Sequence, residues 1–390
     1  MFFRPLAVLF LVLFALDSRA IAGPIREVRP DDTMGTSGAA VVDGAANLAY
    51  TEQIMPIDAD GKMIAPDQAG DQAAAVLDRL EFTLKDGRSG LDQLVKVDVY
   101  LARPDALPAF QKAFARKMAG KARPAVSYVV GALSRPDALV AVDAIAVTSL
   151  SGTRPGGRVA VLPAGPRVFV SGQADPDGDL TVAARKTLEG LDATLKFAGS
   201  DRSRVVRLKA FMQPMTGAAR TAIEREVSNF FGGTNVPPLT LVEWRSSPNQ
   251  PIEIEVVAAG GAPVDVPVEY LTPPALKPSP LFSRVARVKA GPLIYVSGMH
   301  GPSGSTGAAQ VEAIFDTLSA VLAEAGSDFR HLAKATYYVS DEAASRALND
   351  LRPRYFDPKR PPAASKAFVA GVGLERRTVT LDMIAVPKAR

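Results

Sequence analysis

The sequence predicts an α+β protein in which one structural unit occurs three times along 390 residues. The first observation is an apolar segment that recurs near the end of each unit, at residues 140–147, 252–259 and 379–386. The copies lie about 110 to 130 residues apart, which is the length of a small domain. The second observation is that the residues before each copy repeat one order of strand and helix patterns. Both observations predict three small domains rather than one large domain.

The recurring segment reads VAVDAIAV in its first copy and VTLDMIAV in its third. Its side chains would alternate between two mostly apolar faces, which is typical of a strand that is covered on both sides. One acid occupies the same position in every copy: Asp143, Glu255 and Asp382. An acid at an apolar interface needs hydrogen-bond donors, or its pKa rises. These residues are therefore candidate catalytic acids, and carboxylates satisfied by backbone amides are the structural alternative.

Each unit is expected to contain two strands, a helix, a strand, a second helix and two closing strands. Apolar residues at helical spacing predict the first helices, at residues 68–85, 181–197 and 307–325. The second helices are expected at residues 105–120, 217–231 and 343–355. The opening strands of the first two units are typical of strand pairs around short turns at 43–44 and 163–165. Runs of strands with helices able to cover one face indicate an α+β layer.

The pattern places the first unit at residues 23–150, the second at 151–260 and the third at 282–390. Residues 261–281 are rich in proline and have few apolar anchors, which is typical of an extended linker between the second and third units.

Residues 1–22 have the pattern of a secretory signal peptide. Arg4 precedes an apolar run at residues 6–16, and Ala20-Ile21-Ala22 provides a small-x-small cleavage site. We therefore expect a secreted or periplasmic protein, with an N-terminal membrane anchor as the alternative. The remaining residues contain no other long apolar run, so no membrane partner is expected after cleavage.

The composition excludes several classes of function. The net charge of +4 is spread along the chain without a block of Lys or Arg, so nucleic acid is not an expected partner. The chain has no cysteine, which excludes disulfides and thiolate catalysis. Its two histidines, His300 and His331, are too few for a His-rich metal site. We expect neither a metal nor a cofactor.

Several short segments together resemble the RidA (YjgF) family. They are Ser171-Gly172-Gln173, Tyr295-Val296-Ser297-Gly298, the helix end Ala325-Gly326 and the closing acid-x-Ile-Ala-Val at Asp382. The resemblance covers three tandem copies, and it implies a chorismate-mutase-like fold in each. Family members form trimers, so three copies in one chain imply a monomeric pseudo-trimer within the chain. The resemblance also implies small-molecule pockets in the clefts between the domains.

The resemblance implies hydrolysis of reactive 2-imino acids and enamines, with an arginine in a Pro-x-Arg-Ser pattern that holds the substrate carboxylate. In this chain that arginine is replaced in every copy, by Val126, Leu239 and Ala364. A carboxylate bound without its guanidinium would lose on the order of 2 kcal/mol. Nearby arginines could reach a cleft, but surface charge is the simpler interpretation of Arg123, Arg245 and Arg360.

Other candidate ligand-binding residues follow from the same resemblance. Ser171, Ser297 and His300 fall in the segments that line the family's pocket. An exposed loop histidine is the alternative interpretation of His300. The sequence leaves three hypotheses: a small-molecule-binding protein that has lost the usual imine hydrolysis, a deaminase or related hydrolase of altered specificity that uses the closing-strand acids, or a structural or protein-binding module.

Overall fold

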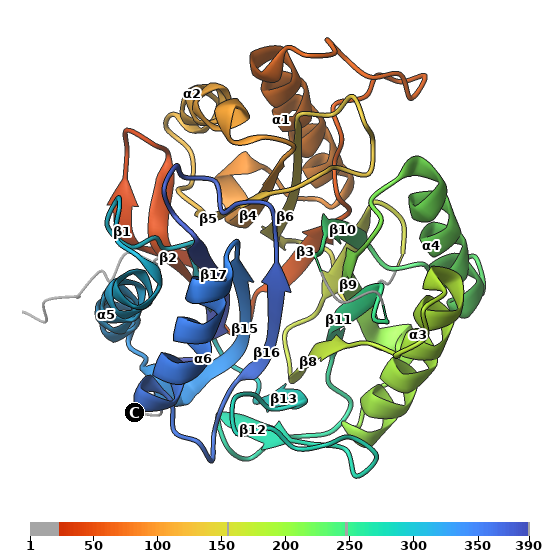
Figure 1. The fold of residues 1–390 in the computed structure, drawn as a ribbon, viewed down its shortest axis with the longest axis vertical. Coiled ribbons are helices and arrows are strands. Elements are labelled where there is room, and N and C mark those ends of the chain that lie inside the picture. The colour runs from red at the N-terminus through yellow and green to blue at the C-terminus, as the bar shows by residue number, and fades with distance from the viewer. Residues whose placement is uncertain (1–22, 154–155, 246–248, 389–390) are drawn as a thin grey trace, which may run out of the picture.

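The computed structural model describes residues 23–153, 156–245 and 249–388, and the expected signal peptide lies outside these ranges. The chain folds into three similar α+β units that surround a common centre (Figure 1). In each unit a mixed sheet faces the centre, and two helices cover its outer face. The sequence-predicted α+β architecture and its arrangement as a pseudo-trimer within one chain are confirmed.

The units repeat one order of elements, which the following bounds give. The first contains β1 (Ile25–Asp31), β2 (Thr36–Val42), β3 (Asn47–Thr51), α1 (Ala69–Asp86), β4 (Leu94–Leu101), α2 (Leu107–Met118), β5 (Ala125–Val130) and β6 (Val140–Thr148). The second contains β7 (Val159–Leu162), β8 (Arg167–Gln173), α3 (Leu180–Phe197), β9 (Val205–Met212), α4 (Gly217–Phe230), β10 (Leu239–Glu243) and β11 (Ile252–Ala259). After β12 (Val268–Leu271), the third contains β13 (Val285–Val288), β14 (Leu293–Val296), α5 (Gly307–Ala325), β15 (Leu332–Val339), α6 (Glu342–Tyr355), β16 (Ala363–Phe368) and β17 (Val379–Ala385).

Each unit contributes a block of four strands that pair with one another. The blocks of the first and third units are joined through β2 into one 11-stranded sheet, and the block of the second unit lies in a separate 6-stranded sheet. In the first unit their order is β5-β4-β6-β3, and the corresponding orders in the others are β10-β9-β11-β8 and β16-β15-β17-β14. The pair β4–β5 is parallel, as are β9–β10 and β15–β16, while the closing strand of each unit is antiparallel to both neighbours. The closing strand therefore lies inside the sheet, as its two apolar faces predicted.

A strand from another unit pairs with the edge of each four-strand block. Strand β7 of the second unit pairs with β3 of the first, and β13 of the third pairs with β8 of the second. The cycle is closed by β2 of the first unit, which pairs with β14 of the third. The predicted local strand pairs are therefore wrong, because the two strands that flank each turn do not pair with each other. Each turn instead carries the chain from the strands of one unit to the strands of another.

Two further strands pair with strands that connect one unit to another. Strand β1 pairs with β2, and β12 pairs with β13. Residues 261–281 were expected to be an extended linker, but four of them form β12 and join a sheet. The apolar pattern missed β12 because only its first residue is buried.

The helices bury the apolar stripes that predicted them. Helix α5 buries residues Val311, Ile314, Phe315, Leu318, Val321 and Leu322 against its sheet. It ends at Gly326, whose φ of 85° lies in the left-handed region that glycine adopts without strain. Asp179 begins α3 by accepting a hydrogen bond from Val182 N at 2.9 Å. These local signals explain why both helix positions could be predicted closely.

A separate core joins the three units at the centre. It contains Tyr50 of the first unit, Phe169 of the second and Tyr295 of the third, together with residues of all three closing strands. The hydroxyls of Tyr50 and Tyr295 are hydrogen-bonded at 2.9 Å. The second apolar face of each closing strand is therefore covered by the other units.

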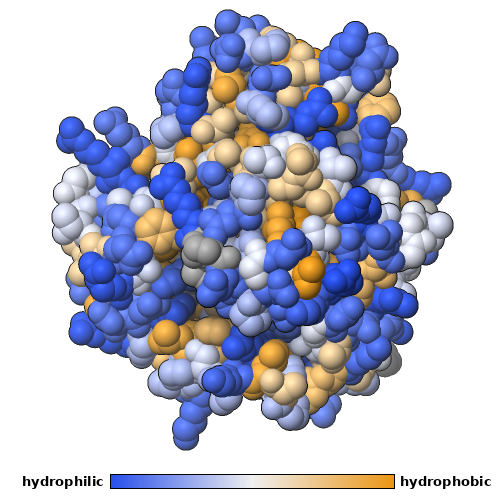
Figure 2. Space-filling model, turned by 45° about the vertical axis from the view of Figure 1, so that its right-hand side comes forward, coloured by the Kyte–Doolittle hydropathy of each residue, from blue (hydrophilic) through white to orange (hydrophobic). Residues whose placement is uncertain are grey.

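The outer surface is predominantly hydrophilic on the face that Figure 2 shows, with small hydrophobic areas between the charged side chains. Within the described ranges, no helix has the length and apolar character needed to cross a membrane.

Candidate functional site

The closing-strand acids lie in a buried ionic network at the centre of the molecule. Alternate residues of β4, β9 and β15 point toward the centre and supply its basic side chains. Asp143 accepts three hydrogen bonds, from Arg207 at 2.7 Å and from Tyr100 and Thr240 at 2.8 Å each. Arg207 and Thr240 belong to the second unit, so this acid connects two units.

Glu255 and Asp382 have equivalent partners from neighbouring units. Glu255 lies 2.8 Å from Lys334 Nζ and accepts a hydrogen bond from Ser365 Oγ at 2.9 Å. Asp382 lies 3.2 Å from Lys96 Nζ and 3.5 Å from Lys209 Nζ. The sequence suggested backbone amides as the structural partners of these acids. In the structure, basic and hydroxyl side chains hold them instead.

The network balances its charges. Four basic groups face four acids: Lys96, Arg207, Lys209 and Lys334, with Asp98, Asp143, Glu255 and Asp382. Burial alone would raise the pKa of Asp98, but Lys209, Lys96 and Arg207 hold it far below its usual range. Burial raises the pKa of Asp143 despite the opposing effect of Arg207.

The central cavity of about 20 Å³ has room for little more than a water molecule. This arrangement favours a structural role for the three acids.

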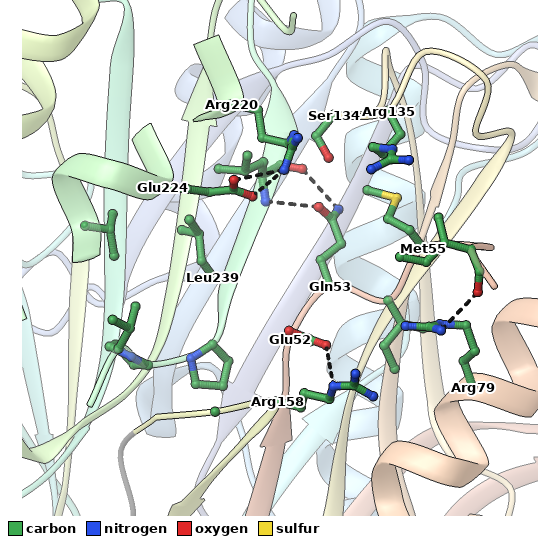
Figure 3. A pocket seen from close by; sticks show the side chains of 18 residues that line it. Glu52, Gln53, Met55, Arg79, Ser134, Arg135, Arg158, Arg220, Glu224 and Leu239 are labelled. Carbon is green, nitrogen blue, oxygen red and sulfur yellow. Dashed lines mark hydrogen bonds and ion pairs between the residues drawn. The ribbon is translucent and has the colours of Figure 1, made fainter. Parts of the chain in front are cut away.

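A cleft between the first and second units encloses a cavity of about 510 Å³ (Figure 3). Leu239 lines it at the position where the resemblance places the substrate-binding arginine. Gln53 lies at its middle and makes two hydrogen bonds with the backbone of Leu241. Gln53 Nε2 donates to Leu241 O at 3.1 Å, and Leu241 N donates to Gln53 Oε1 at 3.3 Å. Gln53 thereby satisfies part of the free edge of β10.

Four arginines surround this cleft, and sequence reasoning missed all of them. Arg79 comes from α1, Arg220 from α4, and Arg135 and Arg158 from loops of the first and second units. Arg220 contacts Glu224 at 2.9 Å, and Arg158 lies 3.8 Å from Glu52. Because these residues come from two helices and two loops, no local motif in the sequence groups them.

The cleft between the first and third units brings Val126 and Ser297 together. Val126 N donates to Ser297 Oγ at 2.8 Å, and Gly298 N donates to Val126 O at 2.9 Å. A cavity of about 300 Å³ lies beside them and is also lined by Arg29 and Tyr128. Two of the predicted ligand-binding residues therefore share a cavity, although the Ser297 hydroxyl is already hydrogen-bonded to Val126 N and Ser37 O.

The cleft between the second and third units is occupied by a glutamate. The Glu253 carboxylate lies so close to Gly172 that a β-carbon there would be 1.8 Å from Oε1. Gly172 N donates to Ser365 Oγ at 2.9 Å, next to Ala364, and the neighbouring Ser171 hydroxyl is buried without a partner among the described residues. Burial raises the pKa of Glu253 to about 7, and Glu255 adds to that rise.

His300 and the three arginines near the prolines lie elsewhere. His300 Nε2 is 2.9 Å from Val372 O, and burial lowers its pKa. Arg123 is paired with Glu27 and Asp32 of the N-terminal segment. Arg360 lies over the ring of Tyr270, 5.7 Å from its centroid. None of these residues, nor Arg245, lines the inter-unit cavities described above.

Comparison with known families agrees with this architecture. The model of the Endoribonuclease L-PSP family matches residues 36–148 and 273–386, which together make up more than half of the chain. The chain therefore belongs to this family, which includes the RidA (YjgF) proteins. The matches fall in the first and third units, and the second is assigned to the same fold by its order of elements.

Individual relatives match about a third of the chain or less. Protein DfrA of Myxococcus xanthus is 31% identical over 113 residues, which cover 27% of this chain and 84% of that protein. A YjgF-family protein of Neisseria meningitidis is 27% identical, with a TM-score of 0.24, and its match covers 32% of this chain and 97% of its own. Yeast Mmf1 is 25% identical, with a TM-score of 0.25, and its match covers 32% of this chain and 98% of its own.

Proposed function

We propose that this protein is an exported, monomeric family member that binds a small molecule in the cleft between its first and second units. The observation that carries the proposal is the cavity of about 510 Å³, which lies within the size range of small-molecule sites. Both units line the cavity, and it combines apolar side chains with a few polar groups. We expect the ligand to bind without a cofactor.

The usual imine hydrolysis of RidA proteins is not part of the proposal. Leu239 lines this cleft where an arginine would hold the carboxylate, and Val126 and Ala364 take that position in the other two clefts. At the boundary between the second and third units, the Glu253 carboxylate lies against Gly172. These features favour binding without the family's chemistry.

The two alternatives have weaker support. An enamine or imine hydrolase that uses Asp143, Glu255 and Asp382 would need a free carboxylate, but each of these acids is held by basic or hydroxyl side chains. A purely structural module would be favoured by closed clefts, but the first cleft is open.

Two measurements test the proposal. The first follows hydrolysis of 2-iminopropanoate, generated in situ, and we expect no acceleration over buffer by the mature chain. The second is a thermal-shift screen with amino acids, 2-keto acids, dicarboxylates and nucleosides, in which we expect at least one class to raise the melting temperature. Leu239→Trp should fill the cleft and abolish that shift, while Val266→Trp on the exposed surface should leave it unchanged. Imine hydrolysis by the wild type, or a shift that Leu239→Trp leaves intact, would contradict the proposal.

A further inference from the structure

The arginines of the cleft between the first and second units indicate what kind of ligand fits it. We propose that this cleft binds a small molecule with two separated anionic groups joined by a short apolar chain, as in a short dicarboxylate. This inference rests on the proposed binding function and specifies its ligand class. The proposed binding does not depend on the arginine of the Pro-x-Arg-Ser pattern, because Leu239 occupies that position in this cleft.

The first argument is charge. Four arginines and two glutamates line the cavity, so it carries two positive charges in excess. Glu224 neutralises Arg220, and Glu52 faces Arg158 at the longer distance of 3.8 Å. Arg79 and Arg135 form no salt bridge among the described residues, although Glu52 and Asp58 lie close enough to Arg79 to act on its charge. The side chain of Arg79 donates a hydrogen bond to Ile57 O, and that of Arg135 donates one to Gly61 O.

The second argument is position. Figure 3 shows Arg135 and Arg220 toward one end of the cleft and Arg79 and Arg158 toward the other, with Gln53 between them. Among the described residues, each end thus has one arginine that forms a salt bridge and one that forms none. A single compact anion would bind at one end of the cleft. The positive charge at the other end would then remain unneutralised. Two anionic groups on one molecule would neutralise both ends.

The third argument is the lining between the ends. It includes the apolar side chains Ile54, Met55, Val236, Leu239 and Leu241. These side chains would cover a short hydrocarbon chain and would bind a polar or branched-polar linker poorly. The guanidiniums are also incompletely satisfied by the protein, because the Nε atoms of Arg79 and Arg220 are buried without hydrogen-bond partners among the described residues.

Isothermal titration calorimetry tests this inference on the mature chain. The probes are the α,ω-dicarboxylates from malonate to pimelate, each compared with its monomethyl ester, which keeps the length but removes one charge. Phosphate monoesters form a second arm, because they carry two charges on a single group. We expect one dicarboxylate to bind about tenfold or more tightly than its monoester and than the phosphate monoesters.

Two single variants locate the binding. Arg79→Gln and Arg135→Gln should each weaken dicarboxylate binding about tenfold while leaving monoester binding less affected. Arg225→Gln is the matched control, because Arg225 is exposed on α4 and does not line the cleft. Circular dichroism melting of all three variants shows whether they remain folded.

The outcomes separate this inference from the proposed function. Equal binding of diacid and monoester, or a dicarboxylate affinity that both variants leave unchanged, would overturn the two-anion inference. If no dicarboxylate binds but a neutral or cationic compound protects the protein through the same cleft, the inference fails and the proposed function stands. If nothing binds in the cleft, both fail.

Discussion

Arg207 of the second unit donates a hydrogen bond to Asp143 of the first, with 2.7 Å between Nη2 and Oδ1. Both side chains are buried, and the same guanidinium lies 3.0 Å from Asp98. One arginine therefore neutralises part of the charge of two acids across the boundary between two units. The equivalent contacts of Lys334 with Glu255 and of Lys96 with Asp382 complete a cycle of ionic contacts around the centre.

Removing one partner of this contact should destabilise the whole chain. Asp143→Ala would leave Arg207 buried with only part of its compensating charge, which costs about 3 kcal/mol or more. Urea unfolding followed by circular dichroism measures the loss. Thr240→Val is the matched comparison, because it removes one hydrogen bond from a neutral hydroxyl to the same carboxylate and should cost less, about 1.5 kcal/mol. An Asp143→Ala variant as stable as the wild type would contradict the assignment of this acid to the structure.

The raised pKa of Glu253 predicts a specific pH dependence of stability. Burial raises this pKa to about 7 in the fold, so the folded chain keeps a proton that the unfolded chain releases above the ordinary value of 4.5. Glu255 raises the pKa further, while Ser365, Arg284 and Lys334 oppose the rise. The free energy of unfolding should therefore fall as the pH rises from about 4.5 to about 7, by up to about 3 kcal/mol.

Glu253→Gln provides the test of that dependence. The amide keeps the shape of the side chain and cannot ionise. The free energy of unfolding of the variant should therefore not fall between pH 4.5 and about 7, and the variant should be more stable than the wild type at pH 8. Unfolding titrations at pH 5, 6, 7 and 8 measure the difference. Glu269→Gln, on the part-exposed strand β12, should leave the profile unchanged. Parallel profiles for wild type and Glu253→Gln would show that this carboxylate does not titrate in that interval.

The exchange of strands predicts that the second unit cannot fold within its own boundaries. A fragment of residues 157–260 lacks β13, so β8 would have an unpaired edge and lose its contacts with that strand. We expect this fragment to aggregate or remain unfolded. A fragment of residues 157–290 adds β12 and β13 and should show more native-like circular dichroism and a smaller hydrodynamic radius. Equal behaviour of both fragments would contradict the importance of the donated strand.

The N-terminal pattern predicts cleavage after Ala22. When the full chain is produced in a Gram-negative bacterium, the intact mass of the protein in the periplasmic fraction should correspond to a chain that begins at Gly23. Replacement of Ala20 and Ala22 by Arg should block cleavage and leave the precursor in the membrane fraction. A full-length protein in the cytoplasm would argue against export.

The sequence allowed the fold to be predicted because its local signals agree. Helix α5 shows both an apolar stripe and a glycine end, and the closing strands carry apolar residues on both faces. The hairpins were predicted wrongly because a strand such as β7 has the same alternation whether it pairs within its unit or with β3. Local pattern determines that a strand forms and which face it buries, but not which edge it joins.

The site was less predictable for a similar reason. The replacement of the family's arginine by Leu239 could be seen directly from the motif. The cluster of Arg79, Arg135, Arg158 and Arg220 could not, because its members come from helices and loops that only the folded chain brings together. The partner of Asp143 could not be predicted either. Arg207 lies on β9, where the sequence pattern showed only that apolar residues alternate.

The closed cycle of exchanged strands also constrains how this chain can be made and how it can change. As the chain is synthesised, β2 appears early and pairs with β1, but its partner β14 belongs to the last unit, so β2 stays without that partner until synthesis is nearly complete. A shortened gene that lost one unit would leave a donor without an acceptor. The strand pairing of this chain therefore depends on all three units, while the residues that line each cleft between two units can differ from one cleft to the next.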